Sequence, residues 1–282
     1  MFSNTLVTTE DLAAHLDDPN WIILDCRFTL TDTGAGRQAY EKAHIPGARY
    51  VHLDDDLSAP VSETTGRHPL PDPRVLTEKL CDWGVGVNKQ VVVYDDSYGA
   101  MAGRLWWMLR WLGHPGVALL DGGYPKWTRE KRPVDNAIPV PHKGACACLP
   151  EPTQIVVADE VLHASRTGEQ LILDARPDRR FSGEFEPLDP VAGHVPGAIN
   201  WQFDENLDVD GTFLPPEALR ENYQALLRGK PAWQMIHMCG SGVTACHNIL
   251  AMEIAGLPGS RLYPGSWSEW ITDPSRPVAT GE

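Results

Sequence analysis

The sequence predicts an α/β protein built from two tandem copies of one domain, each a mostly parallel sheet with helices on both faces. Three observations support this: motifs recur in the same order, short apolar runs alternate with helical patterns, and a proline-rich stretch lies midway along the chain. Strand alternating with helix is typical of parallel sheets covered on both faces. A length of 282 residues suffices for two domains of ordinary size.

The internal repeat is visible in short motifs. "LDCR" (24–27) and "AHIPGA" (43–48) return as "LDAR" (173–176) and "GHVPGA" (193–198). Matching motifs in matching order imply two copies of one fold.

Between the copies lies a segment rich in proline, which blocks helix and central strand and favours an extended linker. We therefore expect domains over residues 1–135 and 153–282, joined by a linker over 136–152.

Local patterns predict the elements of the first copy in order. A helix is expected over "TTEDLAAHL" (8–16), capped by one of its threonines, and then a strand at "WIILD" (21–25). A helix over "VLTEKLCDWG" (75–84) ends at its final glycine. Two more apolar runs are too short for helices and read as buried strands: "QVVVYD" (90–95) and "VALL" (117–120).

The second copy shows the same alternation. "PPEALRENYQALLRG" (215–229) has prolines at its start and glycine past its end, as helices often do. "VTACHNILAMEIAG" (243–256) predicts another helix closed by glycine. Three apolar runs predict strands: "LILD" (171–174), "QMIHM" (234–238) and "RLY" (261–263).

The charge balance argues against polyanionic partners. Lys and Arg number 24 and Asp and Glu 38, a formal net charge of −14, which repels nucleic acid and anionic membrane surfaces. The N-terminal residues lack a signal-peptide pattern, and no uncharged apolar run reaches the roughly 18 residues of a membrane span. We expect no nucleic-acid or membrane partner and a cytoplasmic location.

Most of the six cysteines have ordinary explanations. Six are too few for a disulfide scaffold in this chain, and cytosolic thiols are expected to stay reduced. Cys146 and Cys148 form a CxC near His142, but a closed zinc site needs four ligands, so no metal is expected there. Cys246 is interpreted as a buried helix residue, with a resolving thiol as the alternative.

Cys239 stands where a nucleophile would be expected. It follows the strand at 234–238 and opens the turn "CGSGVTA" (239–245), and open α/β sheets bind ligands at such turns. Gly240 and Gly242 let main-chain amides curl around the sulfur, and the next helix start adds a positive field. Both effects favour the thiolate, so Cys239 is expected to be an ionised nucleophile; burial as a small hydrophobe is the alternative.

The remaining residues of the turn complete the predicted site. The hydroxyls of Ser241 and Thr244 are expected to steer a substrate or a leaving group, and Val243 belongs to the same substrate-binding turn. With a constant offset of 143 between the copies, Asp96 aligns with Cys239. A carboxylate cannot perform thiolate chemistry, so the first copy is expected to be an inactive, supporting domain.

The turn "CGSGVTA", the paired H-[IV]-P-G-A boxes and the "DGGY…W" and "GSWSEW" endings resemble the two-domain rhodanese-like sulfurtransferases over nearly the whole chain. The turn is most similar to that of the 3-mercaptopyruvate sulfurtransferases. Thiosulfate-specific members typically carry basic residues after the cysteine, where this chain has Gly240 and Ser241.

The resemblance implies a persulfide cycle without any cofactor. Cys239 would take a sulfur atom from 3-mercaptopyruvate, pyruvate would leave, and a small thiol, a thioredoxin-like protein or cyanide would remove the sulfur. Attack of a thiolate on soft sulfur is ordinary exchange chemistry, and the persulfide is a reversible modification of cysteine.

The resemblance also implies an arginine for the donor's carboxylate, since a guanidinium binds carboxylates in a fixed fork. Arg180 matches it, with Arg179 ranked second. The family's second arginine, in "E-P-R", is absent, because this chain has Leu188 and Asp189 in "EPLDP"; this leaves the preference between 3-mercaptopyruvate and thiosulfate open. Three arginines of the first copy are candidates to replace it: Arg27, Arg37 and Arg67.

One histidine has two open interpretations. His44 of "AHIPGA" matches a family histidine brought across the domain interface, which implies a proton relay to the departing enolate; a structural role in its own turn is the alternative. Its counterpart His194 is expected to be structural. Both copies share two pairs expected to form ion pairs at strand ends: Asp25 with Arg27, and Asp174 with Arg176.

Three other functions compete with the first. A thiosulfate sulfurtransferase would use the same Cys239. A cysteine phosphatase needs the pattern C-x5-R, but the sixth residue after Cys239 is Ala245. A sulfur-sensing or binding module would present Cys239 to a protein without turnover.

Overall fold

The computed structural model describes residues 2–140, 143–145 and 150–281, and the chain folds into two compact units. The first unit comprises Met1–Ala59, Pro71–Glu151 and Asp208–Phe213; the second comprises Pro60–Leu70, Pro152–Leu207 and Leu214–Glu282. These units differ from the contiguous domains expected over 1–135 and 153–282. Each half of the chain lends one short segment to the other unit, and hydrogen bonds described below hold Pro60–Leu70 in the second.

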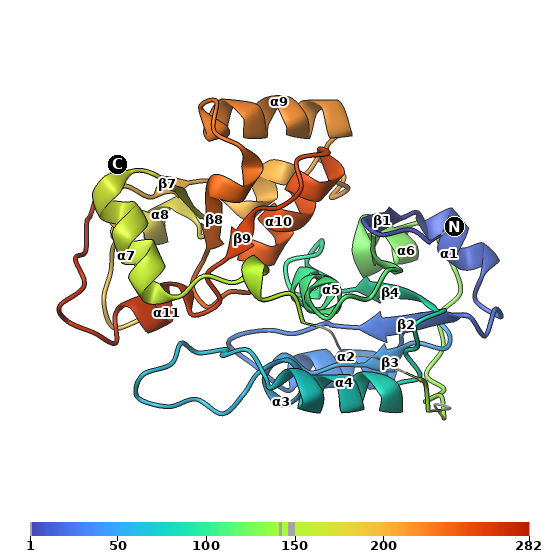
Figure 1. Ribbon diagram of the computed structural model, residues 1–282. Coiled ribbons are helices and arrows are strands. Elements are labelled where there is room, and N and C mark those ends of the chain that lie inside the picture. Colours follow the sequence, from blue (N-terminus) through green and yellow to red (C-terminus); the bar gives the residue numbers. More distant parts are fainter. Residues whose placement is uncertain (1, 141–142, 146–149, 282) are drawn as a thin grey trace. The chain divides into compact units, whose positions relative to one another are not determined.

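The first unit is built on a five-stranded sheet in the order β1-β5-β4-β2-β3, with every pairing parallel. Its strands are β1 (Leu6–Val7), β2 (Trp21–Asp25), β3 (Arg49–Tyr50), β4 (Gln90–Tyr94) and β5 (Val117–Leu120). Its helices are α1 (Thr9–Ala14), α2 (Ala35–Lys42), α3 (Leu53–Leu57), α4 (Pro73–Asp82), α5 (Ala102–Trp111) and α6 (Gly123–Arg129) (Figure 1).

Local chemistry explains where these elements lie. Thr8 caps α1, because its Oγ1 accepts the N–H of Asp11 at 3.0 Å. Asp72 caps α4 in the same way, and Pro73 occupies its first turn. All residues of β4 are buried, as expected for a central parallel strand. One face of the sheet packs on α1 and α6 in a core that includes Leu12, Val92 and Trp127.

The second unit has a four-stranded parallel sheet in the order β7-β6-β8-β9. Its strands are β6 (Leu171–Asp174), β7 (Ile199–Asn200), β8 (Met235–Met238) and β9 (Arg261–Leu262). Its helices are α7 (Ala158–Thr167), α8 (Asp178–Phe181), α9 (Pro216–Leu227), α10 (Ala245–Ile254) and α11 (Ser266–Trp270), with 3-10 turns at Pro152–Gln154, Phe203–Asn206 and Ala232–Gln234. The predicted fold class, two α/β domains with parallel sheets, is confirmed.

The two sheets use the same strand register. Asp25 at the end of β2 pairs with Tyr94 of β4, and Asp174 at the end of β6 pairs with Met238 of β8. The residue that follows β4 therefore corresponds to Cys239, which follows β8.

That residue is Asp95, not Asp96, so the aligned position expected from the sequence is wrong by one. A second hydrogen bond agrees: the carbonyl of Asp95 accepts the N–H of Tyr124, just as the carbonyl of Cys239 accepts that of Trp267. The turn after β4 and the turn after β8 differ in length, and an alignment with one constant offset between the copies cannot account for such a difference.

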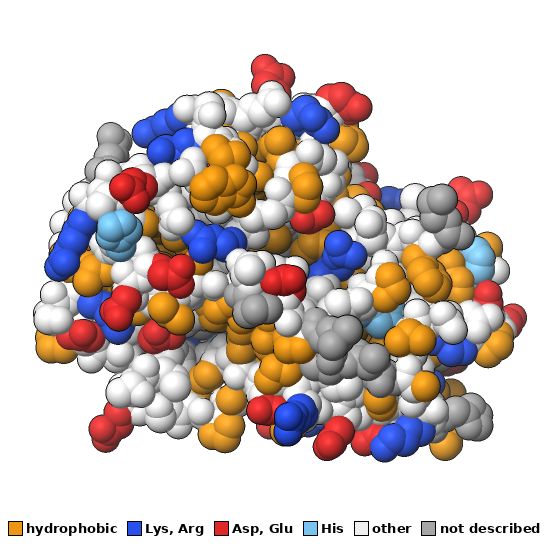
Figure 2. Space-filling model, in the orientation of Figure 1, with side chains coloured by type: hydrophobic (Ala, Val, Ile, Leu, Met, Phe, Trp, Pro, Cys, Tyr) orange, Lys and Arg blue, Asp and Glu red, His pale blue; other side chains and the backbone are white. Residues whose placement is uncertain are grey.

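On the face of the molecule shown in Figure 2, acidic and basic side chains are interspersed. Among the described residues, each helix falls short of the length and apolar character that crossing a bilayer requires.

Candidate active site

Cys239 lies directly after β8 in the second unit, with 2% of its surface exposed. Its Sγ accepts the main-chain N–H of Val243 at 3.3 Å. Its own N–H donates to the Oγ of Ser266 at 3.0 Å, and its carbonyl accepts the N–H of Trp267 at 3.0 Å. The cysteine is therefore fixed on both sides of its main chain, and its sulfur faces an amide of the turn.

The two glycines of the turn serve different needs. Gly242 has φ +73°, and a methyl group there would lie 2.3 Å from the carbonyl oxygen of Pro264, so only glycine fits. At Gly240 a methyl group would lie 2.8 Å from Nη2 of Arg67 and 3.4 Å from both terminal nitrogens of Arg180. Two guanidinium groups therefore lie against the bare main chain beside Cys239.

Ser266 supports the turn, and its own backbone adopts an unfavourable conformation. It is fully buried with φ +53°, a conformation that costs a non-glycine residue about 1–2 kcal/mol. Its Oγ accepts the N–H of Cys239 and donates to the carbonyl of Tyr263 at 2.9 Å, which holds it there. Sequence reasoning missed this residue, although the repeat aligns it with Gly123, which has φ +56°.

Ser241 is paired with a histidine that sequence reasoning did not single out. Its Oγ lies 2.7 Å from Nδ1 of His68, and both residues are buried. His68 belongs to Pro60–Leu70, which is anchored where the N–H of Arg67 donates to the Oγ of Ser268 at 3.0 Å. This segment carries no repeat motif, so no signal in the sequence joined it to the turn.

His44, the histidine singled out from the sequence, is held within the first unit. Its Nδ1 lies 2.7 Å from the carbonyl of Tyr40 and its Nε2 lies 3.2 Å from that of Ala137. The ring stacks on that of Tyr40 and is fully buried. These contacts account for the structural role; the relay role of His44 stays a prediction.

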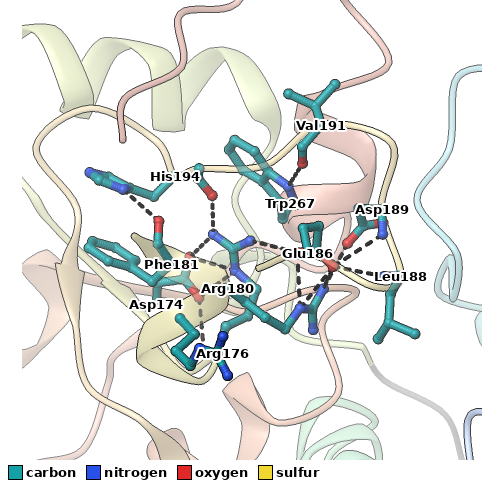
Figure 3. A network of polar contacts seen from close by, with 12 residues as sticks. Asp174, Arg176, Arg180, Phe181, Glu186, Leu188, Asp189, Val191, His194 and Trp267 are labelled. Carbon is teal, nitrogen blue, oxygen red and sulfur yellow. Dashed lines mark hydrogen bonds and ion pairs between the residues drawn. The ribbon is translucent and has the colours of Figure 1, made fainter. Parts of the chain in front are cut away.

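Arg180, on α8, is turned toward two carboxylates (Figure 3). Its Nε donates to both oxygens of Glu186, at 3.0 and 2.9 Å, and its Nη2 donates to Oδ2 of Asp189 at 2.9 Å. The other oxygen of Asp189 accepts a hydrogen bond from Nη1 of Arg67. Asp189, whose side chain is 3% exposed, thus joins the two arginines that lie against Gly240.

Three arginines were candidates to replace the family's second carboxylate-binding arginine, and of these Arg67 reaches the turn at Cys239. Arg27 forms a buried ion pair with Asp25 at 2.7 Å, and the guanidinium of Arg37 lies over the ring of Tyr50. The expected ion pair at the end of β2 is therefore confirmed.

Arg176 extends the ionic cluster under the turn. It pairs with Asp174 at 2.8 Å, approaches Glu186 at 3.5 Å and lies over the ring of Trp267. Burial opposes its charge, yet Asp174, Glu186 and Cys239 together raise the pKa of Arg176 above its ordinary value. The pKa of Glu186 is lowered, because hydrogen bonds from Arg180 and two main-chain amides outweigh its burial.

A model of the rhodanese-like domain matches residues 8–130 and 157–273, which include every strand of the two sheets except β1. The chain belongs to the rhodanese-like family.

Individual relatives agree with this assignment. A Pseudomonas aeruginosa protein named "Probable 3-mercaptopyruvate sulfurtransferase" is 50% identical over 100% of each chain. A Mycobacterium tuberculosis protein named "Putative thiosulfate sulfurtransferase SseB" is 37% identical over 98% of this chain and 97% of its own. The structure of 3-mercaptopyruvate sulfurtransferase from Leishmania major superposes with a TM-score of 0.83 at 29% identity, covering 95% of this chain and 74% of that one. The protein is a sulfurtransferase-type enzyme.

The first rhodanese-like domain fills its corresponding turn with a carboxylate of its own. The side chain of Asp95 is buried and accepts the main-chain N–H groups of four residues, all at 2.8 or 2.9 Å: Ser97, Gly99, Met101 and Ala102. Burial raises the pKa of Asp95, and the four amides oppose that rise. The turn of the first domain therefore already encloses an acidic group.

The other predicted residues are placed as follows in the second rhodanese-like domain. Val243 is buried and contributes its amide to the Cys239 sulfur, while Thr244 precedes α10 as its N-cap without a side-chain capping bond. Cys246 is fully buried on α10, and its Sγ donates to the carbonyl of Gly242 at 3.5 Å.

Four of the six cysteines lie in the part of the chain that the structure describes. Cys26, Cys239 and Cys246 form no disulfide, whereas Cys81 is disulfide-bonded, against the expectation of reduced thiols. Within the described part of the chain, no three His, Cys, Asp or Glu side chains gather as metal ligands would. The proposed CxC group lies outside the described residues: His142, Cys146 and Cys148.

Proposed function

We propose that the enzyme transfers a sulfur atom from 3-mercaptopyruvate to an acceptor through a persulfide on Cys239. The observation that carries the proposal is the position of Arg67 and Arg180 against Gly240, the residue next to the cysteine. Two guanidinium groups suit a small donor with a carboxylate at one end and sulfur at the other, because they bind carboxylates through charge-assisted hydrogen bonds.

The chemistry starts at the Cys239 thiolate, next to the Val243 amide. The thiolate attacks the donor's sulfur: an S–S bond forms, the donor's C–S bond breaks, and its electron pair leaves as the enolate of pyruvate. Protonation of the enolate carbon gives pyruvate. Ser241 lies two residues after Cys239 in the turn and contacts His68, so we propose that this pair delivers the proton.

The second half-reaction returns the enzyme to its starting state. An acceptor thiolate, from a small thiol or a thioredoxin-like protein, attacks the outer sulfur of the persulfide, or cyanide does so to give thiocyanate. The persulfide S–S bond breaks, and its electron pair returns to Cys239 as thiolate. The first domain has Asp95 at the position of the nucleophile, so we assign it a supporting, non-catalytic role.

A thiosulfate sulfurtransferase is the second candidate, favoured by the name of the Mycobacterium relative and by the attraction of two arginines for any anion. A module that binds sulfur without turnover would load one sulfur and release one pyruvate, but would not pass the sulfur on to an acceptor.

Single-turnover loading with each donor separates the two sulfurtransferases, and later addition of a small thiol, which removes the sulfur only from a turning-over enzyme, separates them from the binding module. The enzyme is incubated with 3-mercaptopyruvate or thiosulfate, and the mass of the Cys239 peptide and the pyruvate released are measured. We expect one added sulfur on Cys239 and a stoichiometric amount of pyruvate, and Cys239→Ser should abolish both. Faster loading from thiosulfate would support the second candidate, and loading from neither donor would refute sulfur transfer at Cys239.

A further inference from the structure

The carboxylate of Asp189 takes one terminal nitrogen of each of the two arginines that a donor's carboxylate would use. One oxygen accepts from Arg67 and the other from Arg180, both of which lie against Gly240. The side chain is 3% exposed, so this is a built contact rather than a surface ion pair. A donor's acidic group and Asp189 therefore compete for the same two guanidinium groups.

The main chain holds Asp189 in this position. The amides of Leu188 and Asp189 donate to Oε1 of Glu186, at 2.9 and 3.1 Å, and Glu186 is itself tied to Arg180. These contacts hold the Asp189 carboxylate toward the two arginines.

The charged side chains around Asp189 balance one another. The cluster contains three cations and three anions, paired as described above: Arg67, Arg176 and Arg180 with Asp174, Glu186 and Asp189. The cluster is therefore neutral before the Cys239 thiolate forms. A donor with one negative charge approaches a site of net charge −1, and each further negative charge on the donor adds repulsion in a poorly screened environment.

We propose that Asp189 is a specificity-determining residue that selects donors with one negative charge and disfavours dianions such as thiosulfate. The inference rests on the proposed function for its natural donor, but it concerns the anion preference of the Cys239 site itself. The sequence position where an arginine was expected thus holds a residue with the opposite effect on anion binding.

The first test compares donors in Asp189→Asn, which keeps the shape of the side chain and removes its charge. We expect kcat/KM for thiosulfate relative to 3-mercaptopyruvate to rise about tenfold, mainly through KM, a change equivalent to about 1.4 kcal/mol. Glu184→Gln is the matched control, since this carboxylate pairs with Arg179 at 3.1 Å in an exposed position away from Gly240. An unchanged ratio in Asp189→Asn, or an equal rise in Glu184→Gln, would overturn the proposal.

A second test does not depend on turnover. Alkylation of Cys239 by anionic iodoacetate and by neutral iodoacetamide is followed by peptide mass spectrometry, which distinguishes it from Cys26 and Cys246. The iodoacetate-to-iodoacetamide rate ratio should rise several-fold in Asp189→Asn. If it does so while neither donor loads sulfur, the anion preference stands and the proposed function falls.

A third measurement uses the unaltered enzyme and so does not depend on the folding of a variant. With Asp189 on both arginines, millimolar sulfate is expected to leave the iodoacetamide rate at Cys239 unchanged. Protection of Cys239 by sulfate would show that the two guanidinium groups are open to dianions, and this would refute the role of Asp189.

Discussion

Nδ1 of His68 lies 2.7 Å from the Oγ of Ser241, although 173 residues separate them along the chain. The contact links an imidazole, the side chain best suited to proton transfer near neutral pH, to a hydroxyl two residues from Cys239. Both residues belong to the second compact unit.

His68→Asn is therefore expected to slow pyruvate formation. General acid-base catalysis contributes at least about a hundredfold, so kcat should fall by roughly that factor with a smaller change in KM. Steady-state kinetics with 3-mercaptopyruvate measure it.

His44→Asn is the comparison, because both ring nitrogens of His44 face main-chain carbonyls of the first unit. We expect a lower melting temperature and a kcat within a small factor of the original. The reverse pattern, with kcat lost at His44 and kept at His68, would restore the relay role to His44.

Gly242→Ala is expected to destabilise the turn strongly. The positive φ costs about 1–2 kcal/mol, and forcing a methyl group against the carbonyl of Pro264 costs about 1–3 kcal/mol more. Sulfur loading should fall with it. Gly168→Ala is the control, since it also has a positive φ but nothing within 4 Å of the new methyl group, and denaturant unfolding should show only the smaller loss. Equal losses would mean that the Pro264 contact is absent in solution.

Replacement of Ser266 separates its hydrogen bonds from its backbone conformation. Ser266→Ala leaves the buried N–H of Cys239 without its partner and keeps φ positive, so a loss of about 1–3 kcal/mol in the free energy of unfolding is expected. Ser266→Gly loses the same hydrogen bonds but accommodates the left-handed φ, and should be less destabilised by on the order of 1 kcal/mol. The opposite order in chemical denaturation would argue against the strained conformation.

His237, on β8, gives the second unit a defined pH dependence. Burial lowers its pKa to about 3, whereas an unfolded histidine titrates near 6.5. Between these values the unfolded chain binds the proton and the folded chain does not. The stability is thus fully present above about pH 6.5 and declines as the pH falls, by up to about 1.4 kcal/mol per unit.

His237→Leu should remove this part of the slope when unfolding free energies are measured from pH 7 to pH 4. His163→Gln, which replaces an exposed histidine, should leave the slope as it is. A slope unaffected by His237→Leu would show that the buried ring is protonated or solvated in the folded state.

Local patterns were enough to predict much of this molecule. The apolar runs at β2, β4, β5, β6 and β8 were recognised because buried parallel strands need apolar side chains on both faces. The turn at Cys239 was recognised for a similar reason: only small residues permit its main-chain path, as the φ of Gly242 shows. Such constraints act within a few residues, so they are written in the sequence.

The partners of the turn were harder to predict. Asp95 was missed in favour of Asp96, because a one-residue difference in turn length is invisible to a constant offset. Leu188 and Asp189 were noticed as a departure from the family, but nothing in their neighbourhood indicated that Asp189 would contact two arginines.

By itself, the sequence determined the doubled α/β fold and the position of a cysteine at the start of a glycine-rich turn. Both follow from short-range periodicity and backbone freedom. Only the tertiary structure decided which arginines lie against Gly240 and which histidine contacts Ser241, the two residues that follow that cysteine. Arg67 and His68 come from a segment of the first half that packs in the second unit, and contacts over such separations depend on the assembled fold rather than on local pattern.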